Sequence, residues 1–302
     1  MTLFSYKVFV TIVEHMNFRK AAEELNLTPS AVSHCVSGME EELGFPLFIR
    51  KNNKISLTGD AKALLPYIKQ LLLSENAVNQ AIAEIQGFEK GTVKLGCFNS
   101  VCISWIPKLV KNFSGKYPGI KIELFQGTYD DIVEWLENGT IDLGFLSVSS
   151  AGKIPITPLY NDRLMCAVPK KFKTHNEGFI TIDELKECDF VQPAENCDAD
   201  SQMLFENSGF VAQSTCHVVD DMSILTMVQS GIGVCILPKM TVESYNANVD
   251  VYPIYPEAYR VIGISAFEST RKTPIVNKLY NMIVDLFTEQ YTCLLYTSPS
   301  PR

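Results

Sequence analysis

Small polar side chains recur along residues 27–44 of this chain, where the sequence is LTPSAVSHCVSGMEEELG. After Thr28, the hydroxyl and imidazole groups are those of Ser30, Ser33, His34 and Ser37. Short uncharged groups of this kind can hydrogen-bond to base edges in the major groove of DNA, whereas acidic side chains in their place would be repelled by phosphates. The chemistry that this stretch indicates is the recognition of a DNA sequence.

The same stretch is predicted to be a helix that buries its other side. Thr28 suits the N-cap, Pro29 suits the first helical position, and Gly44 can end the helix. Apolar side chains recur at helical spacing, at Ala31, Val32, Val36, Met39 and Leu43. One face therefore packs against the protein, and the acids at 40–42 fall at the far end of the helix.

Two earlier helices are expected to present this face. Residues 3–16 and 18–25 have helical patterns, and a tight break at Asn26 and Leu27 precedes the polar helix. A helix, a short turn and a second helix make the helix-turn-helix unit, whose second helix lies in the major groove. The residues expected to contact DNA from these helices are Arg19, Thr28, Ser30, Ser33, His34 and Ser37.

Basic residues follow in a second pattern. Residues 45–57 alternate apolar and polar side chains around Asn52 and Asn53, which predicts two short strands joined by a turn. Arg50, Lys51 and Lys54 lie near this turn and are expected to contact phosphates. The alternative is a small helical core with solvated charges, and the order of the signals along residues 3–57 favours a winged helix-turn-helix over it.

The segment 18–64, FRKAAEELNLTPSAVSHCVSGMEEELGFPLFIRKNNKISLTGDAKAL, resembles the LysR-type transcriptional regulators. The residues that carry the resemblance are AA, AVS, E-x-x-LG, LF-x-R and LT in that order, and it extends more loosely over nearly the whole chain. The resemblance implies a regulator that binds a double-stranded operator as a dimer or tetramer, and that contacts RNA polymerase if it activates. Cys35 stands where the family often has glutamine and Lys54 where it often has arginine, which bears on the bases that are read.

Composition and charge agree with a regulator of this kind. The chain has 302 residues, enough for two or three domains, and a net charge of -8, which argues against a general nucleic-acid coat. Residues 1–57 hold six Lys or Arg and six Asp or Glu, so the acidity belongs to the rest of the chain. No start resembling a signal peptide and no apolar run of membrane-span length is present, which predicts a cytoplasmic protein with no membrane partner.

A long helix is predicted over residues 58–86, with Thr58 as its cap. Its apolar positions recur at spacings of four and three, with one acid among them, at Leu64, Ile68, Leu71, Glu75, Val78, Ile82 and Ile85. Such a stripe could pack on the chain's own C-terminal domain or pair with a second subunit. Pairing is favoured, because helix-turn-helix proteins gain affinity by binding two half-sites.

From Thr92 onward strands and helices alternate, which predicts an α/β fold with parallel strands. The organisation expected is a winged helix-turn-helix at 1–57, a linker (dimerisation) helix at 58–87 and an effector domain at 88–302. Within the last, subdomain 1 covers about 92–162 and 266–290, and subdomain 2 about 163–265. A last helix at 274–288 should return to subdomain 1. By resemblance to the family, this domain is similar to periplasmic binding proteins.

Ligands in open α/β sheets bind beyond the carboxyl ends of strands. The residues at these positions are Asn99, Ser100, Gly127, Thr128, Leu146 and Ser147 in subdomain 1, with Gln192, Pro193 and Asp221 in subdomain 2. Helix N-termini and hydroxyls there suit a carboxylate or another small polar effector, so an anionic effector is expected. Ser100 and Thr128 could equally serve as helix caps.

Other classes of protein find less support. His15, His34, His175 and His217 show no metal spacing and no phosphate loop is present, so no catalytic residue, metal or cofactor is expected. A solute-binding protein would need export and would leave the first ninety residues without a role.

A closer alternative is a redox-sensing regulator of the same family, using Cys188 or Cys197. Cys197 is flanked by Glu195, Asp198 and Asp200, which would raise its pKa and slow its oxidation, so small-molecule sensing is preferred. Residues 291–302 fit no element and are expected to be a disordered or non-native extension.

Overall fold

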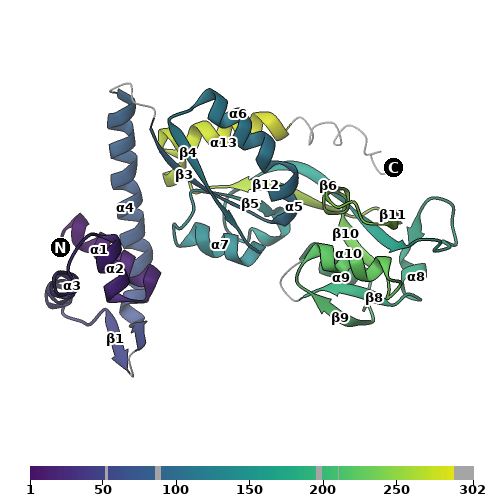
Figure 1. Ribbon diagram of the computed structural model, residues 1–302, viewed down its shortest axis with the longest axis horizontal. Helices are drawn as coiled ribbons and strands as arrows, with labels where there is room; N and C mark the ends of the chain where they lie inside the picture. The colour runs from purple at the N-terminus through teal and green to yellow at the C-terminus, as the bar shows by residue number, and fades with distance from the viewer. Residues whose placement is uncertain (52–53, 86–89, 195–198, 210, 289–302) are drawn as a thin grey trace.

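The structure is a computed structural model that describes residues 1–51, 54–85, 90–194, 199–209 and 211–288. Along the chain lie a small helical unit, one long helix and an α/β unit with two lobes (Figure 1). None of the described helices is both long and apolar enough to cross a membrane. The turn expected at Asn52 and Asn53 and the tail at 291–302 lie outside the described residues.

Three helices form the N-terminal unit: α1 (Leu3–His15), α2 (Phe18–Glu24) and α3 (Pro29–Leu43). Each begins at a polar N-cap, because the side chains of Thr2, Asn17 and Thr28 accept hydrogen bonds from backbone amides of the first turn. Ala21 and Ala22 are fully buried where α2 meets its neighbours, and small side chains there allow a close crossing.

The wing consists of β1 (Phe48–Lys51) and β2 (Lys54–Leu57), which pair antiparallel. Glu40, near the end of α3, accepts hydrogen bonds from the backbone amides of Leu47 at 2.7 Å and Phe48 at 3.3 Å. The first of the three acids in this stretch therefore anchors the start of the wing to the end of α3.

The long helix α4 (Gly59–Ile85) begins after Thr58, whose hydroxyl accepts a hydrogen bond from the amide of Ala61 at 3.1 Å. One part of α4 packs on its own chain: Ile68 is 1% exposed in the N-terminal core, and the helix also contacts α12 (Glu268–Arg271) and α13 (Pro274–Phe287). Farther along, an apolar stripe is exposed. Leu71, Val78 and Ile82 are 48%, 58% and 47% exposed.

Subdomain 1 is built on the parallel strands β3 (Gly91–Cys97), β4 (Ile120–Gln126) and β5 (Leu143–Ser147), with β12 (Tyr259–Ser265) antiparallel to β5. Helices α6 (Ile106–Lys116) and α13 cover one face of this sheet, and α7 (Tyr129–Glu137) covers the other (Figure 1). The short α5 (Asn99–Ser104) and η1 (Val148–Ser150) follow β3 and β5 directly. Because α13 packs on β3 and α6, the predicted return of the last helix is confirmed.

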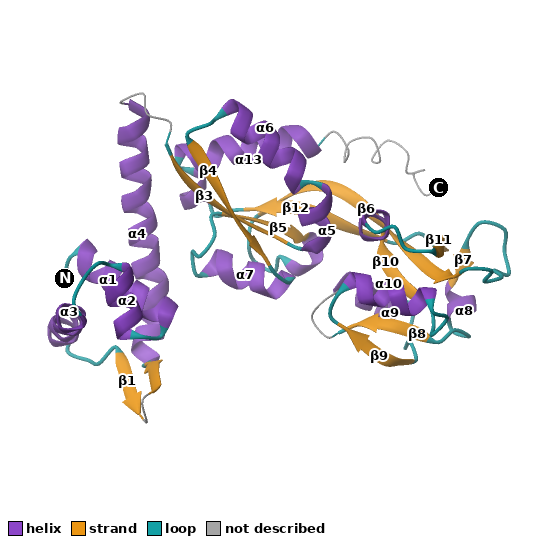
Figure 2. Cartoon of the chain, in the orientation of Figure 1, coloured by secondary structure: helices purple, strands orange, loops and turns teal. Residues whose placement is uncertain are grey.

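Subdomain 2 contains the far half of β6 (Ile156–Pro169) with β10 (Cys235–Pro238) and β11 (Val249–Tyr255), both antiparallel to β6. The strand β7 (Ile180–Thr181) pairs with β11, while β8 (Phe190–Pro193) and β9 (Ser214–Val218) form a separate parallel pair. Its helices are α8 (Ile182–Leu185), α9 (Ala199–Asn207), α10 (Asp221–Gln229) and α11 (Lys239–Ser244) (Figure 2).

One long strand joins the subdomains. The eight-stranded sheet has the order β4-β3-β5-β12-β6-β11-β7, with β10 also on β6, and β6 belongs to both lobes because its first half pairs with β12 and its second half with β10 and β11. The strand β6 begins at Ile156, before the boundary at about 163 that was expected between the subdomains, and so it crosses that boundary. The predicted fold class is confirmed: a winged helix-turn-helix, a long helix and a two-lobed α/β unit.

Candidate functional site

The polar face of α3 is exposed at its N-terminal end. Ser30, His34 and Ser37 are exposed and Ser33 is half-buried, while Val32, Val36 and Met39 are buried on the opposite side. Thr28 accepts a hydrogen bond from the amide of Ala31 at 3.2 Å, and its hydroxyl lies 3.0 Å from that of Ser30. A row of short hydroxyl and imidazole groups therefore faces outward from the start of this helix.

The basic residues lie on α2 and on the two strands of the wing. Arg19 of α2 is highly exposed and makes only a 3.4 Å surface pair with Glu23. Lys51 is exposed at the end of β1, Arg50 belongs to the same strand, and Lys54 begins β2. The wing projects from the end of the three-helix unit (Figure 1), which suits these cations for contact with a backbone of phosphates.

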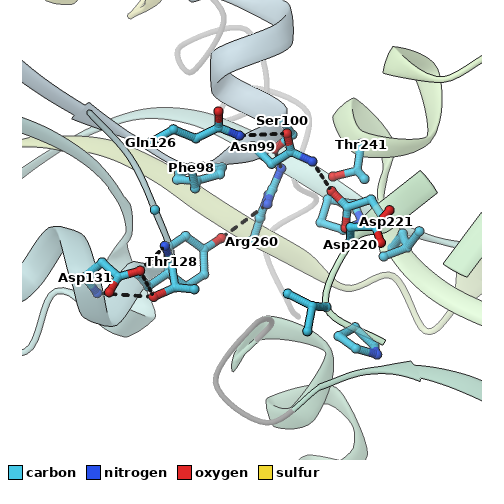
Figure 3. A pocket seen from close by; sticks show the side chains of 16 residues that line it. Phe98, Asn99, Ser100, Gln126, Thr128, Asp131, Asp220, Asp221, Thr241 and Arg260 are labelled. Atoms are coloured by element: carbon cyan, nitrogen blue, oxygen red, sulfur yellow. Dashed lines mark hydrogen bonds between the residues drawn. The ribbon is translucent and has the colours of Figure 1, made fainter. Parts of the chain in front are cut away.

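A cavity of about 380 Å³ lies between the two subdomains. From subdomain 1 it is lined by residues that follow β3 and β4, and from subdomain 2 by the start of α10 and the ends of β8 and β10 (Figure 3). Six of the nine residues expected at the effector site line it: Asn99, Ser100, Gly127, Thr128, Pro193 and Asp221.

The other three residues expected at the effector site lie elsewhere. Leu146 is fully buried in the core of subdomain 1. Ser147 lines a second cavity of about 600 Å³ on the other side of Arg260, and Gln192 pairs with His217 within the β8-β9 ribbon. The rule that ligands bind beyond the carboxyl ends of strands therefore predicted the lining residues after β3 and β4 more accurately than those after β5 and β8.

Asn99 joins the two sides of the cleft. Its amide nitrogen donates hydrogen bonds to a carboxylate oxygen of Asp221 at 2.9 Å and to the hydroxyl of Tyr245 at 2.8 Å. The amide of Gln126 in turn donates to the side-chain oxygen of Asn99 at 3.2 Å. Burial raises the pKa of Asp221 above its usual range, although the hydrogen bond from Asn99 and the charge of Arg260 oppose this rise.

Arg260 closes the floor of the cleft. It is 5% exposed and stands directly opposite Asp162, which is fully buried, in the register of β12 with β6. The guanidinium donates two hydrogen bonds to one oxygen of Asp162, at 2.7 and 2.9 Å, and a third to the hydroxyl of Ser100 at 2.7 Å. Burial raises the pKa of Asp162, and the adjacent guanidinium opposes that rise.

The buried network continues from Arg260 into subdomain 2. The hydroxyl of Tyr129 accepts a hydrogen bond from Arg260 at 3.2 Å and donates one to Asp200 at 3.2 Å. Asp200, at the start of α9, also accepts from Ser147 at 2.8 Å and Ser149 at 2.7 Å. Sequence patterns did not predict four residues of this network: Arg260, Asp162, Tyr129 and Asp200. For Arg260 and Asp162, a charged residue within a predominantly apolar strand was the feature that could have indicated a buried ion pair.

Thr128 serves as a helix cap. Its hydroxyl donates to Asp131 at 2.7 Å and accepts from the backbone amide of that residue at 3.2 Å, and its own amide donates to the same carboxylate at 2.8 Å. This reciprocal arrangement is a capping box for α7. Among the described residues, no group of His, Cys, Asp and Glu has the arrangement of a metal site.

Two family models match the chain. Residues 3–62 match "Bacterial regulatory helix-turn-helix protein, lysR family", and residues 86–288 match "LysR substrate binding domain". A relative from Bacillus subtilis strain 168, the uncharacterized HTH-type transcriptional regulator YvbU, is 30% identical over 295 residues, which cover 95% of this chain and 99% of the relative.

Two solved structures show the same fold. A full-length variant of OxyR from Pseudomonas aeruginosa superposes with a TM-score of 0.78 at 20% identity, covering 94% of each chain. The effector binding domain of QuiR in complex with shikimate superposes with a TM-score of 0.60 at 21% identity, covering 66% of this chain and 98% of that one.

Proposed function

Because the chain belongs to the LysR family of DNA-binding transcriptional regulators with an effector-binding domain, we propose how its own residues divide these two tasks. The start of α3 contacts bases, the wing contacts phosphates, and a small molecule in the cleft between the subdomains controls DNA binding. The observation that carries the proposal is the outward row of short, uncharged side chains on α3, with the exposed cations beside it.

The contacts proposed for the operator fall into two groups. Residues at the start of α3 reach base edges: Thr28, Ser30, Ser33, His34 and Ser37. Residues of α2 and the wing pair with phosphates: Arg19, Arg50, Lys51 and Lys54. Phosphate contacts position a protein on DNA without regard to sequence, and base contacts supply the preference. A regulator of this kind acts where the chromosome is, so the cytoplasm is the compartment proposed.

Substitutions in the two groups should have different effects on DNA binding. With a duplex that the parent protein selects from a random pool, His34→Ala should reduce the preference over scrambled DNA by about 1–3 kcal/mol, since it removes a base contact. Lys51→Ala should weaken binding to both duplexes alike and reduce the slope of log K against log salt by about 1. Fluorescence anisotropy at several salt concentrations measures both quantities.

Lys153→Ala removes the same charge from an exposed position of the effector domain, and as the matched control it should change neither the preference nor the salt slope. The division proposed would be wrong if Lys51→Ala altered sequence preference while His34→Ala altered only the salt slope. A parent protein that selected no sequence from the pool would contradict operator binding itself.

We propose that the exposed stripe of α4, formed by Leu71, Val78 and Ile82, pairs with a second copy of the chain. Three large apolar side chains, each about half exposed on one helix, favour burial against a like surface. A dimer presents two copies of α3 to two half-sites, and pairs of dimers would give a tetramer. If the protein activates transcription, RNA polymerase is a further partner.

For the effector, the proposed contacts are the residues that line the cleft: Asn99, Ser100, Gly127, Thr128, Pro193 and Asp221. Support comes from the match of residues 86–288 to the substrate binding domain and from the likeness to QuiR, which was solved with shikimate. The cavity volume of about 380 Å³ falls at the lower end of the range of ligand pockets, about 300–1,000 Å³, which suits a small metabolite.

The redox alternative finds less support in the surroundings of the cysteines. Cys197 lies outside the described residues. Burial and the nearby carboxylates of Glu184, Glu187 and Asp189 raise the pKa of Cys188, so that its thiol is protonated at neutral pH and reacts slowly with oxidants.

Operator binding is therefore expected to be unchanged after treatment with equimolar hydrogen peroxide. The parent and Cys188→Ser should behave alike in the anisotropy assay. A loss of operator binding in the parent that Cys188→Ser or Cys197→Ser prevents, and that a thiol reductant reverses, would establish the redox alternative instead.

A further inference from the structure

Two of the side chains that line the cleft already use their hydrogen-bond donors within the protein. The hydroxyl of Thr128 donates to Asp131, and both bonds donated by the amide nitrogen of Asn99 go to Asp221 and Tyr245. An anion needs donors, and these two side chains could offer theirs only by giving up the bonds that they make now. The cleft is therefore poorer in available donors than its hydroxyl and amide residues suggest.

The charges that line the cleft are mainly negative. Asp131 lies on the side of subdomain 1, and Asp220 and Asp221 lie on the side of subdomain 2 (Figure 3). The one cation among the lining residues is Arg260, which is paired with the buried Asp162. The carboxylates thus outnumber the cation, and the charge of that cation is balanced from below the cleft, so the field within the cavity disfavours an anion.

Asp221 makes no direct salt bridge among the described residues, although the charge of Arg260 acts on it from a distance. One of its oxygens accepts the hydrogen bond from Asn99, and its other oxygen has no hydrogen-bond partner among the described residues. Its neighbour Asp220 caps α10 by accepting from the amide of Ser223 at 2.9 Å, and hydrogen bonds from the side chain and from the backbone of Ser223 lower the pKa of Asp220 and keep it ionised. Burying a carboxylate without a partner costs free energy, which a ligand cation would recover.

We propose that the effector carries a protonated amine or a guanidinium group and that this group binds Asp221 at the N-terminal end of α10. The negative charge of Asp220 adds to the attraction for this cationic group. The proposal rests on the cleft being the effector site, as put forward under the proposed function. It replaces the anion expected from the sequence.

Matched panels of small molecules test this charge class. The cationic probes are putrescine, cadaverine, agmatine, lysine and arginine, and the anionic probes are succinate, glutarate and adipate, all at pH 7 and constant ionic strength. Binding to the full-length protein is measured by thermal shift and then by calorimetry. At least one cationic probe should bind the parent with a dissociation constant below about 1 mM, and the anionic probes should not bind.

Substitution of the acids should then localise the binding. Asp221→Asn should lower the affinity for the cationic probe at least about tenfold, because it removes the negative charge and keeps the shape of the side chain. The control is Asp130→Asn, which removes the same charge from an exposed position on α7 that does not line the cleft, and it should leave the affinity within about twofold.

Three results would overturn the proposal: binding of the anionic probes, failure of every cationic probe, or equal affinity of the cationic probe for the parent and Asp221→Asn. Operator binding is measured on the same preparations. If succinate or another anion bound the cleft and changed operator affinity, the proposal of a cationic effector would be wrong, while the proposed function would remain supported. If the parent selected no operator, the proposed function would fall whatever the probes did.

Discussion

Replacement of Arg260 by methionine is expected to lower the free energy of unfolding of the effector domain by about 3 to 5 kcal/mol. The guanidinium is 5% exposed and satisfies Asp162, which has no exposed surface of its own. Its removal leaves a buried carboxylate without a countercharge and the hydroxyl of Ser100 without its donor. Such a loss is a large fraction of the roughly 5 to 15 kcal/mol by which a domain is stable, so a clear fall in the midpoint of urea unfolding is the expected result.

Tryptophan fluorescence measures this change selectively. The chain has two tryptophans, Trp105 and Trp135, and both belong to the effector domain, so urea titrations followed by fluorescence exclude the N-terminal unit. The control is Arg163→Met, at the position in β6 next to Asp162. Arg163 makes a partly exposed ion pair with Glu257, and loss of this pair should lower the free energy of unfolding by under about 1 kcal/mol. Equal effects of the two substitutions would mean that burial of the Arg260 pair contributes nothing.

A second variant separates the charge from the packing. In Arg260→Met with Asp162→Asn, the carboxylate charge is gone, and the asparagine side chain can still accept the hydrogen bond that Met240 donates to Asp162 at 3.0 Å. The double variant should therefore recover part of the stability lost in Arg260→Met. If the double variant were less stable than Arg260→Met by the full cost of a second core substitution, an uncompensated charge would not be the cause.

Aspartate at both Leu71 and Val78 is expected to convert the protein to a monomer and to weaken operator binding about 100-fold or more. Pairing of α4 with a second subunit would bury these side chains, and two charges in such an interface have no partner there. A monomer binds one half-site, and loses the gain of about 10²- to 10⁴-fold that linkage of two sites provides. Light scattering gives the mass, and anisotropy with the selected duplex gives the affinity.

The matched control adds the same two charges off the stripe. Asn76→Asp with Asn79→Asp lies on the same helix, at exposed positions that are not part of the row formed by Leu71, Val78 and Ile82. It should keep both the mass and the operator affinity of the parent. An unchanged mass for the Leu71 and Val78 variant would show that the stripe is not the subunit contact.

Local patterns predicted the elements that carry their own signals. Thr28 and Pro29 marked the start of α3, and the apolar spacing after Thr58 marked α4, because caps and helical periods are properties of neighbouring residues. The loops after β3 and β4 were found by the rule that ligands bind at carboxyl ends of strands. The resemblance of residues 18–64 to a family supplied the order in which these parts are joined.

The buried network at the base of the cleft was beyond such patterns. The pair of Arg260 and Asp162 depends on the register of two strands almost one hundred residues apart, and no local period records a register of that kind. The anion expected at Ser100 and Thr128 rested on helix N-termini and on these hydroxyls, but the hydroxyl of Thr128 already donates its hydrogen bond to Asp131. For Thr128 the sequence held a clue, since an acid three residues later is the mark of a capping box.

The sharing of β6 between the two lobes bears on how the effector domain melts. One half of β6 pairs with β12 and the other half with β10 and β11, so the strands of both lobes depend on this one strand. Hydrogen exchange should then find one cooperative foldon across the sheet, in which the slowest amides of β5 and of β10 open together. A substitution that weakens β6 should therefore lower the stability of both lobes at once.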